Sequence, residues 1–392
     1  MAIMRVSILR LAKRFANAVL YLPLRALNVF QPHQRDPSLT PKRILLLNGA
    51  HIGDMVITSS LLPVLQSAFP GAEIGIVCGS WAREVLAGHP HVSFTHEIDH
   101  WRMNRAEMSL TRKVGRYWTT RRSALNQIRE LKYDLSISVH VSRPDYLELA
   151  WLAGIPARAA FTRSLWAPLA TVLAAYPAEN AAFITQGACF ETLLRALGIG
   201  EEHIRLRRSS LPPSSPKAIA EVSALFGELP LDRVVYSVVH MGAGSPAREL
   251  SAAFWRELSE RLDHCILFTG AGEREQAKIR GVTQGASNCI DASGKLSWAG
   301  FVAAVRHAKS LYGVDSAAVH VAAAVGTPCF AVYSGISGVG RWRPESDSSE
   351  VWTQPVPCSP CHRWNGCPEM SCRKGIVPQN LLHIQAVDAR SI

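Results

Sequence analysis

One short segment near the C-terminal end of the chain brings together a carboxylate, a hydroxyl and an imidazole. Residues Ser310 to Gly335 read SLYGVDSAAVHVAAAVGTPCFAVYSG, which predicts a buried strand, an Ala-rich helix and a second buried strand. Asp315 and Ser316 fall at the helix start, where their oxygens can accept hydrogen bonds from free first-turn N–H groups, and His320 follows about one turn later. A helix N-terminus at the carboxyl end of a buried strand suits a phosphorylated ligand. The alternative is an ordinary capped helix with a buried histidine.

A second segment of the same kind lies early in the chain. Residues Arg43 to Leu65 read RILLLNGAHIGDMVITSSLLPVL, which predicts a buried strand, a Gly-containing loop and a helix. Gly49 and Gly53 would allow a close backbone approach to a ligand or a positive φ. Asp54 falls at the junction of loop and helix, where a carboxylate either caps the helix or performs acid–base chemistry.

Together the two segments resemble the signatures of glycosyltransferase family 9, the heptosyltransferases. The family has a G-D-[IVM]-[VL] loop after the first strand and a D-S-G-x-x-H-x-A-A-A-x-G-T-P run near the end. This chain departs from the second signature at one position, where Ala317 replaces the usual Gly. The resemblance covers the chain from about Arg43 to the C-terminus, with both motifs in the family's order. It implies a nucleotide-sugar donor and an inverting transfer, with Asp54 as the catalytic base.

The elements that would position these residues alternate between strands and helices. Strand-like runs and helical runs in the first half, followed by a restart of the strand rhythm in the second half, predict an α/β protein with doubly wound parallel sheets. The expected strands are Ile44–Leu47, Ile74–Cys78, Ser93–Ile98, Leu135–Val141, Val234–His240, Cys265–Thr269, Cys289–Asp291, Ser310–Val314 and Cys329–Tyr333, and the expected helices include Thr58–Ala68 and Arg121–Leu131. Two Rossmann-like domains facing one cleft form the GT-B fold, which the resemblance also implies.

The expected domain organisation follows from a Pro/Ser-rich stretch at Ser209 to Lys217. We expect an N-terminal basic helix and linker over residues 1–42, an acceptor domain over 43–212 and a nucleotide-sugar domain over 213–376. A C-terminal helix is expected within residues 377–392, and in the family such a helix packs back across the first domain.

A loop after the strand Val234–His240 is the expected site of the donor diphosphate. It reads HMGAGSPAR, and its small residues allow backbone donors to approach phosphate. Arg248 could hold the diphosphate as a fixed cation, with Gly244 and Ser245 as weaker candidates. The family has G-A-S-x-x-K-R-W-P here, so the basic pair and the Trp-Pro are degraded in this chain.

The resemblance also implies a residue that contacts the nucleotide, and it indicates whether a catalytic metal is needed. An acidic residue in the turn after the strand Cys265–Thr269 contacts the nucleotide ribose in the family, and Glu273 matches by position. A capped helix start is the alternative there. No DxD pair accompanies the donor motifs, so no catalytic metal is expected.

The composition and net charge of the chain limit the classes of molecule that it could bind. The chain has 392 residues, 48% of them hydrophobic and 19% charged, with a formal net charge of +11. A positive charge of this size suits an anionic partner, which could be nucleic acid, an anionic membrane surface or an acidic substrate. No zinc-finger, RNA-binding or leucine-zipper signature is present, which argues against nucleic acid. No apolar run is long enough to span a membrane.

The first 30 residues read as a basic amphipathic helix suited to lying on anionic lipid. A helix packed on the body of the protein is the alternative. We therefore expect a cytoplasmic protein held peripherally on the cytoplasmic face of the inner membrane.

Positive charge is concentrated between Arg102 and Arg122. On the acceptor half of the protein this segment would suit a phosphorylated or carboxylated acceptor, such as lipopolysaccharide inner core. A solvated basic face is the alternative. The candidate acceptor-binding residues are Arg102, Arg105, Arg112, Lys113 and Arg116.

Four of the nine cysteines lie close together in one Pro/Gly-containing loop. They are Cys358, Cys361, Cys367 and Cys372, a spacing that fits a structural zinc or iron site. Reduced thiols or disulfides are the alternative. We expect such a site to stiffen the loop at a distance from the cleft.

These observations and the resemblance favour an inverting glycosyltransferase that moves a sugar, heptose from ADP-heptose above all, to a lipopolysaccharide core or related cell-envelope glycan, with an acidic glycolipid as the expected acceptor. A protein O-heptosyltransferase acting on autotransporter adhesins, or an inactive nucleotide-sugar-binding scaffold, are the alternatives. Gly53, Gly244, Ser245, Arg248, Glu273, Asp315, Ser316 and His320 are the predicted donor-binding residues.

Overall fold

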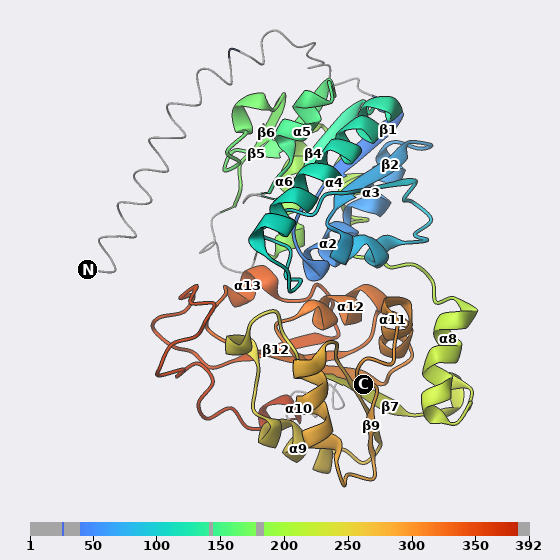
Figure 1. The fold of residues 1–392 in the computed structure, drawn as a ribbon, viewed down its shortest axis with the longest axis vertical. Helices are drawn as coiled ribbons and strands as arrows, with labels where there is room; N and C mark the ends of the chain where they lie inside the picture. Colours follow the sequence, from blue (N-terminus) through green and yellow to red (C-terminus); the bar gives the residue numbers. More distant parts are fainter. Residues whose placement is uncertain (1–25, 27–39, 141–143, 178–183, 383–392) are drawn as a thin grey trace.

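The computed structural model describes residues 26, 40–140, 144–177 and 184–382. They form two six-stranded parallel sheets, one in each half of the chain (Figure 1). The first sheet has the order β3-β2-β1-β4-β5-β6. Its strands are β1 (Arg43–Leu47), β2 (Glu73–Cys78), β3 (Phe94–Glu97), β4 (Leu135–Ser138), β5 (Ala157–Phe161) and β6 (Val172–Ala174).

The second sheet has the order β12-β11-β10-β7-β8-β9. Its strands are β7 (Tyr236–His240), β8 (Cys265–Thr269), β9 (Cys289–Asp291), β10 (Ser310–Val314), β11 (Cys329–Tyr333) and β12 (Ser349–Thr353). In each sheet the strand order reverses beside the first strand, between β1 and β4 and between β7 and β10. Ligands of doubly wound sheets bind at the carboxyl ends of the strands at this point.

Helices cover both faces of each sheet, which explains why the strands are apolar on both sides. In β1, for example, Ile44 and Leu46 join one hydrophobic cluster while Leu45 and Leu47 join another. In the first domain the helices are α2 (Ile52–Thr58), α3 (Leu61–Ala68), α4 (Leu110–Leu131), α5 (Leu147–Leu152), α6 (Gln186–Ala196) and α7 (Glu201–Ile204). In the second they are α8 (Pro216–Ser223), α9 (Ala252–Glu260), α10 (Glu273–Thr283), α11 (Trp298–Arg306), α12 (Ala317–Val325) and α13 (Val339–Trp342). Short 3₁₀ helices are η1 (Ser80–Leu86), η2 (Ala167–Leu169), η3 (Ala224–Phe226), η4 (Leu231–Arg233) and η5 (Pro246–Arg248).

The α/β architecture with two parallel doubly wound sheets confirms the predicted fold class. The boundary expected between residues 212 and 213 lies between α7 and α8. Two helices differ from the expectation. The run predicted as one helix over Thr58–Ala68 lies in two, because α2 ends at Thr58 and α3 begins at Leu61. The helix predicted over Arg121–Leu131 starts earlier, at Leu110, where an exposed basic stretch lacks the apolar period that marks a helix.

The two domains meet where α2 packs against α12. One hydrophobic cluster runs through this contact, with members from both sheets. Gly53 is at the contact, and a Cβ built on it would lie 3.4 Å from the His320 ring and 3.5 Å from Cα of Ala317. Neither Gly53 nor Gly49 has a positive φ. Close packing explains the glycine at Gly49, where a Cβ would lie 2.5 Å from the Tyr146 ring, whereas the distances at Gly53 are those of ordinary van der Waals contact.

Both ends of the chain lie partly outside the described residues. The predicted basic helix over Met1–Phe30 lies outside the described residues, apart from Ala26. Of the predicted C-terminal helix, residues 379–382 are described as helical, and Leu381 is fully buried in the core of the second domain rather than the first. No helix within the described part of the chain has the length and apolar character needed to cross a membrane.

Candidate active site

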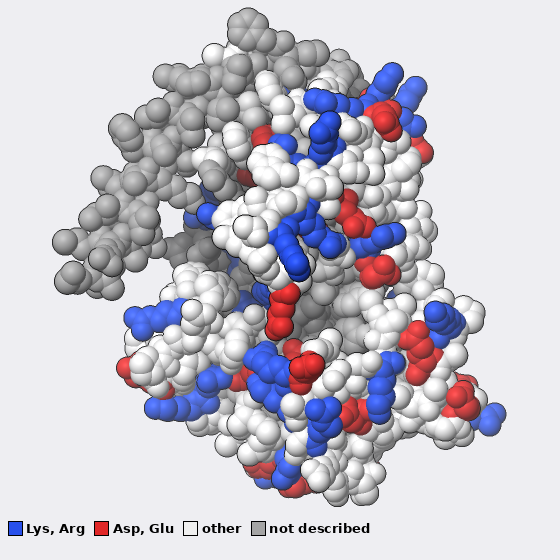
Figure 2. Space-filling view, viewed as in Figure 1, with Lys and Arg blue, Asp and Glu red and all other residues white. Residues whose placement is uncertain are grey.

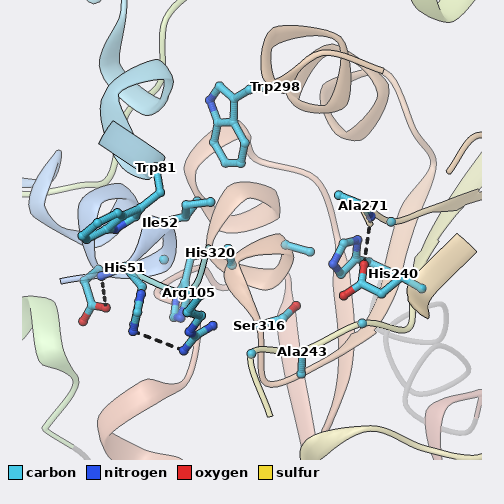
Figure 3. Close-up of a pocket in the computed structure, with 18 of the residues that line it drawn as sticks. His51, Ile52, Trp81, Arg105, His240, Ala243, Ala271, Trp298, Ser316 and His320 are labelled. Carbon is cyan, nitrogen blue, oxygen red and sulfur yellow. Dashed lines mark hydrogen bonds between the residues drawn. The ribbon is translucent and has the colours of Figure 1, made fainter. Parts of the chain in front are cut away.

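A cleft of about 1010 Å³ lies between the two domains. It is lined by loops that follow strands β1, β7, β8 and β10, together with the segment before α4. In Figure 3, His51, Trp81 and Arg105 enter the pocket from the first domain, and Ser316, Ala243 and Ala271 enter it from the second. The cleft therefore occupies the strand-order reversal point of both sheets, as expected for a ligand site.

Asp54 lines the cleft and also caps its own helix. It is the third residue of α2, and its Oδ2 accepts a hydrogen bond of 3.2 Å from the backbone N–H of His51. This cap holds one carboxylate oxygen at the helix start. The two roles considered from the sequence thus coexist, because capping orients the carboxylate at the edge of the cleft.

His51 and Arg105 form a polar pair beside Asp54. Nη2 of Arg105 donates to Nε2 of His51 at 3.2 Å (Figure 3). Burial, reinforced by the charge of Arg105, lowers the pKa of His51 to about 4. The imidazole is therefore neutral near pH 7 and can accept this hydrogen bond.

Arg105 also reaches across the cleft. Its guanidinium lies against Gly244 of the second domain, in the space that a side chain at that position would need. Burial and the positive charge of Arg248 lower the pKa of Arg105. Two guanidinium groups from opposite domains thus repel one another, an arrangement that an anionic ligand between them would stabilise.

Arg248 and Asp315 form an ion pair at the reversal point of the second sheet. Nε of Arg248 lies 3.3 Å from Oδ2 of Asp315, and Nη1 donates to the Asp315 backbone carbonyl at 3.4 Å. Ser337 donates a further hydrogen bond of 2.6 Å to the same carboxylate oxygen. These contacts hold the guanidinium at the start of α12 and direct it along the cleft wall.

The start of α12 differs from the sequence expectation. No side chain caps this helix, and the Asp315 carboxylate is engaged by Ser337 and Arg248 instead. The Oγ of Ser316 is buried and has no hydrogen-bond partner among the described residues. A helix N-terminus with no side-chain cap and a free hydroxyl in the same cleft is equipped to bind an anion.

His320 also lines the cleft, one turn into α12. It is 7% exposed, and burial lowers its pKa against the opposing influence of Asp315 and Asp54. His320 is therefore a neutral ring in the cleft wall near pH 7 and does not contribute a positive charge to anion binding.

The loop after β7 contains the other predicted donor residues. Gly244 and Ser245 both line the cleft. The Ser245 hydroxyl donates to the backbone carbonyl of Trp364 and accepts from the N–H of Ala247 at 3.3 Å, so it is already engaged within the protein.

Glu249 stands where the family has a basic residue, and the structure shows how its charge is balanced. Its side chain is 4% exposed and forms ion pairs with Arg274 and Lys278 of α10. It also accepts a hydrogen bond of 3.3 Å from the N–H of Ala243. The acidic substitution therefore ties the loop after β7 to α10.

The acidic residue beside the nucleotide turn is Glu275 rather than Glu273. Glu273 is exposed and does not line the cleft. Glu275 does, and its Oε2 accepts from the N–H of Ala271 at 2.9 Å (Figure 3). The carboxylate also lies against Gly242, where a side chain would collide with it. Glu273 is the first residue of α10 and lies outside the cleft lining, so the structure brings Glu275, two residues later, to the cleft instead.

The basic segment divides between cleft and surface. Arg105 and Arg116 line the cleft, but Arg116 is paired with the buried carboxylate of Asp99. Arg102 lies over the Trp101 ring at 4.6 Å, and Lys113 donates to the backbone of Asn104 at 2.9 Å. Arg112 is exposed on α4. Figure 2 shows basic side chains on the face formed by α4, above the hollow between the domains.

The four cysteines do not form a ligand cluster in this structure. Cys358 is exposed, Cys372 is buried, and Sγ of Cys367 accepts from the N–H of Met370 at 3.3 Å. Among the described residues, no three His, Cys, Asp or Glu side chains are placed to hold a metal ion. The donor chemistry suits zinc or iron, whereas the present arrangement of the thiols does not fit a bound metal.

The expectation that the cysteine loop lies far from the cleft is wrong. Trp364, inside this loop, lines the cleft, and the Arg248 guanidinium carbon lies 4.8 Å from the centre of its ring. The loop after β7 lines the cleft and is short. The cysteine loop packs over it and therefore also reaches the cleft.

Aromatic residues in the cleft wall were not predicted from the sequence. Trp81 donates its indole N–H to the Ala50 carbonyl at 2.8 Å, and Trp298 packs against Phe301 with ring centres 5.8 Å apart. Their positions follow the ends of β2 and β9, and that placement is the only sequence signal that could have identified them.

Comparisons with known proteins relate the chain to heptosyltransferases. Residues 214–369 match the model of glycosyltransferase family 9 (heptosyltransferase). Lipopolysaccharide heptosyltransferase 1 of Pseudomonas aeruginosa is 25% identical over 335 residues, covering 81% of this chain and 86% of that protein.

Two solved structures share the fold. ADP-heptose lps heptosyltransferase II of E. coli has a TM-score of 0.68 at 19% identity, covering 89% of this chain and 99% of that one. E. coli heptosyltransferase WaaC with ADP has a TM-score of 0.64 at 18% identity, covering 88% and 99%. The family match lies in the domain that holds Arg248, Glu275 and the start of α12. The second domain of the chain therefore matches glycosyltransferase family 9, and the chain shares its fold with solved heptosyltransferases.

Proposed function

We propose that this protein transfers heptose from ADP-heptose to a lipopolysaccharide core or a related acidic glycolipid. The observation that carries the proposal is the meeting, in one cleft, of the Asp54 carboxylate from the first domain with Arg248 and the start of α12 from the second. The similarity to a curated lipopolysaccharide heptosyltransferase and to a heptosyltransferase solved with ADP supports the choice of donor and acceptor.

The chemistry needs a base on one side of the sugar and a cationic site on the other. Asp54 would take the proton of the acceptor hydroxyl, which attacks the anomeric carbon as the bond to the diphosphate breaks. Arg248, the free Ser316 hydroxyl and the N-terminus of α12 would stabilise the charge that develops on the departing diphosphate. Glu275, which lines the cleft, rather than Glu273, would accept hydrogen bonds from the ribose.

On the acceptor side, Arg105 is the basic residue best placed to contact an anionic group near Asp54. Arg116 would add to the positive field although its own charge is paired. We assign Arg102, Arg112 and Lys113 to the outer basic face of the first domain, where they would steer an acidic glycolipid toward the cleft.

We also propose that the N-terminal segment attaches the protein to the cytoplasmic face of the inner membrane. Its support is the sequence alone, in which Arg5, Arg10, Lys13, Arg14 and Arg25 interrupt apolar residues. Removal of residues 1–30 should release the protein from anionic liposomes, and added salt should weaken binding of the intact chain. Equal sedimentation of both forms with liposomes would refute the attachment.

A structural zinc or iron held by Cys358, Cys361, Cys367 and Cys372 is a further proposal that rests on the spacing of these residues. Binding would have to draw together thiols that are apart in this structure. Elemental analysis of protein purified without chelator should find about one metal per chain. Absence of metal, with all four thiols alkylated rapidly, would refute it.

Release of ADP tests the proposed function. Purified protein with ADP-heptose and a heptose-deficient core acceptor should release ADP only when both substrates are present. Equal release without the acceptor would indicate hydrolysis, and no release when both substrates are present would contradict the proposal.

A further inference from the structure

The cysteine loop, defined here as residues 358–373, covers the whole segment Ser245–Glu249. Ser245 donates to the backbone of Trp364, and Arg373 donates to the carbonyls of Pro246 and Glu249. Gly366 packs on Ala247, since a Cβ built on it would lie 3.5 Å from that of Ala247. The remaining member of the segment, Arg248, has its guanidinium over the Trp364 ring.

The same loop also supports the partner of Arg248. The N–H groups of Cys361 and His362 donate to the carbonyls of Gly335 and Ile336 at 3.1 and 2.9 Å. The next residue along the chain, Ser337, donates its hydroxyl to Asp315. Gly335 is tightly packed, because a Cβ there would lie 3.2 Å from Cβ of Cys372. Both sides of the Arg248–Asp315 pair therefore rest on the cysteine loop.

Trp364 is unusual among the aromatic residues of the second domain. It is 47% exposed although it lines the cleft, and its ring is the surface on which Arg248 lies. An arginine side chain has many rotamers, and a planar ring beneath the guanidinium restricts them through a cation–π contact. With Asp315 on one side and Trp364 on the other, the guanidinium is held in one orientation before any ligand arrives.

We propose that Trp364 is a positioning residue for the donor diphosphate, acting through Arg248. The cysteine loop thereby forms one wall of the donor site and prepares the cation for binding. This inference rests on the proposed function, since it assumes that a nucleoside diphosphate occupies the cleft. It implies that any change that loosens the cysteine loop weakens donor binding without altering the acceptor side.

The test measures binding of ADP by isothermal titration calorimetry to the full chain and its variants. Trp364→Ala should weaken ADP binding by about three- to tenfold, the range expected for loss of a partly exposed cation–π contact. Trp364→Phe should recover most of that loss because it keeps an aromatic face. Trp364→Leu keeps an apolar side chain without that face and should not.

Two further variants separate positioning from general damage. Trp118→Ala is the matched control, because Trp118 is also exposed and carries an arginine, Arg121, 5.7 Å from its ring, but lies outside the cleft lining. It should leave ADP binding unchanged. In an Arg248→Ala background, Trp364→Ala should cost little more, since the residue acts through the absent guanidinium.

The outcomes distinguish the two claims. If the unaltered protein fails to bind ADP, the proposed function itself is wrong. If it binds ADP but Trp364→Ala binds equally well, the positioning role is wrong. Equal losses in the Phe and Leu variants, or full additivity with Arg248→Ala, would also overturn it.

Discussion

Replacing Ser316 with alanine should change stability and ligand affinity in opposite directions. In the free protein the Ser316 hydroxyl is buried in the cleft wall without a hydrogen-bond partner. An unsatisfied buried hydroxyl costs about 1–3 kcal/mol of stability. Ser316→Ala removes that cost and should raise the free energy of unfolding, by about 1 kcal/mol once the lost packing is counted, or the apparent melting temperature by about 2–4 °C.

Binding should respond the other way. A hydroxyl that donates to a charged phosphate oxygen contributes about 1.5–3 kcal/mol, so Ser316→Ala should weaken ADP-heptose binding by about ten- to a hundredfold. Thermal denaturation without ligand and calorimetric titration with ADP-heptose measure the two effects separately.

Ser349 provides the matched control for this substitution. Its hydroxyl is also buried and unpartnered, on β12, but it does not line the cleft. Ser349→Ala should stabilise the protein similarly and leave ADP-heptose affinity unchanged. If Ser316→Ala lost stability and kept full affinity, the hydroxyl would be a structural group and the anion site at α12 would be misplaced.

Four other variants test separate roles of single residues. Asp54→Asn keeps size and capping but removes basicity, so turnover should fall by about two to four decades while ADP-heptose still binds; near-normal turnover would exclude Asp54 as the base. Glu275→Gln should weaken nucleotide binding by about tenfold and Glu273→Gln should not, and the reverse result would restore the original assignment. Burial lowers the pKa of His89 from its ordinary value of 6.5 to about 4 in the folded protein. As the pH falls below 6.5, His89 therefore takes up a proton in the unfolded chain but not yet in the folded protein. Stability should therefore fall by up to about 3 kcal/mol between pH 6.5 and 4, and His89→Gln should reduce that slope in chemical denaturation; an unchanged slope would place the titration elsewhere.

Most strands were predicted from the sequence because each is a short apolar run, buried by helices on both faces of its sheet. Five strands of the second sheet have their expected ends within two residues, and four of them match at both ends, namely Cys265–Thr269, Cys289–Asp291, Ser310–Val314 and Cys329–Tyr333. Three strands were missed. β5 is Ala-rich and contains Arg158, β6 has only three residues, and β12 is half-buried at the sheet edge without a continuous apolar run. The start of α4 was missed for a related reason, because its first turns are basic and exposed.

Residues of the candidate site could be predicted where a charged side chain follows a predicted strand closely in the sequence, as for Asp54, Arg248 and Asp315. Contacts between distant segments could not be predicted this way. Trp364 enters the cleft only because the cysteine loop folds over Ser245–Glu249, and Gly49 lacks a side chain because Tyr146 and Pro144 occupy the space that a Cβ would need. Glu275 lines the cleft and Glu273 does not, because residues two apart on a helix face different directions.

The central claim is that this cleft transfers heptose to an acceptor with Asp54 as base. Mass spectrometry of a heptose-deficient core acceptor, incubated with the protein and ADP-heptose, tests it most directly. The account predicts an acceptor heavier by one heptose residue with the unaltered protein and an unchanged acceptor with Asp54→Asn. An unchanged acceptor with the unaltered protein, although ADP-heptose binds in the cleft, would contradict it.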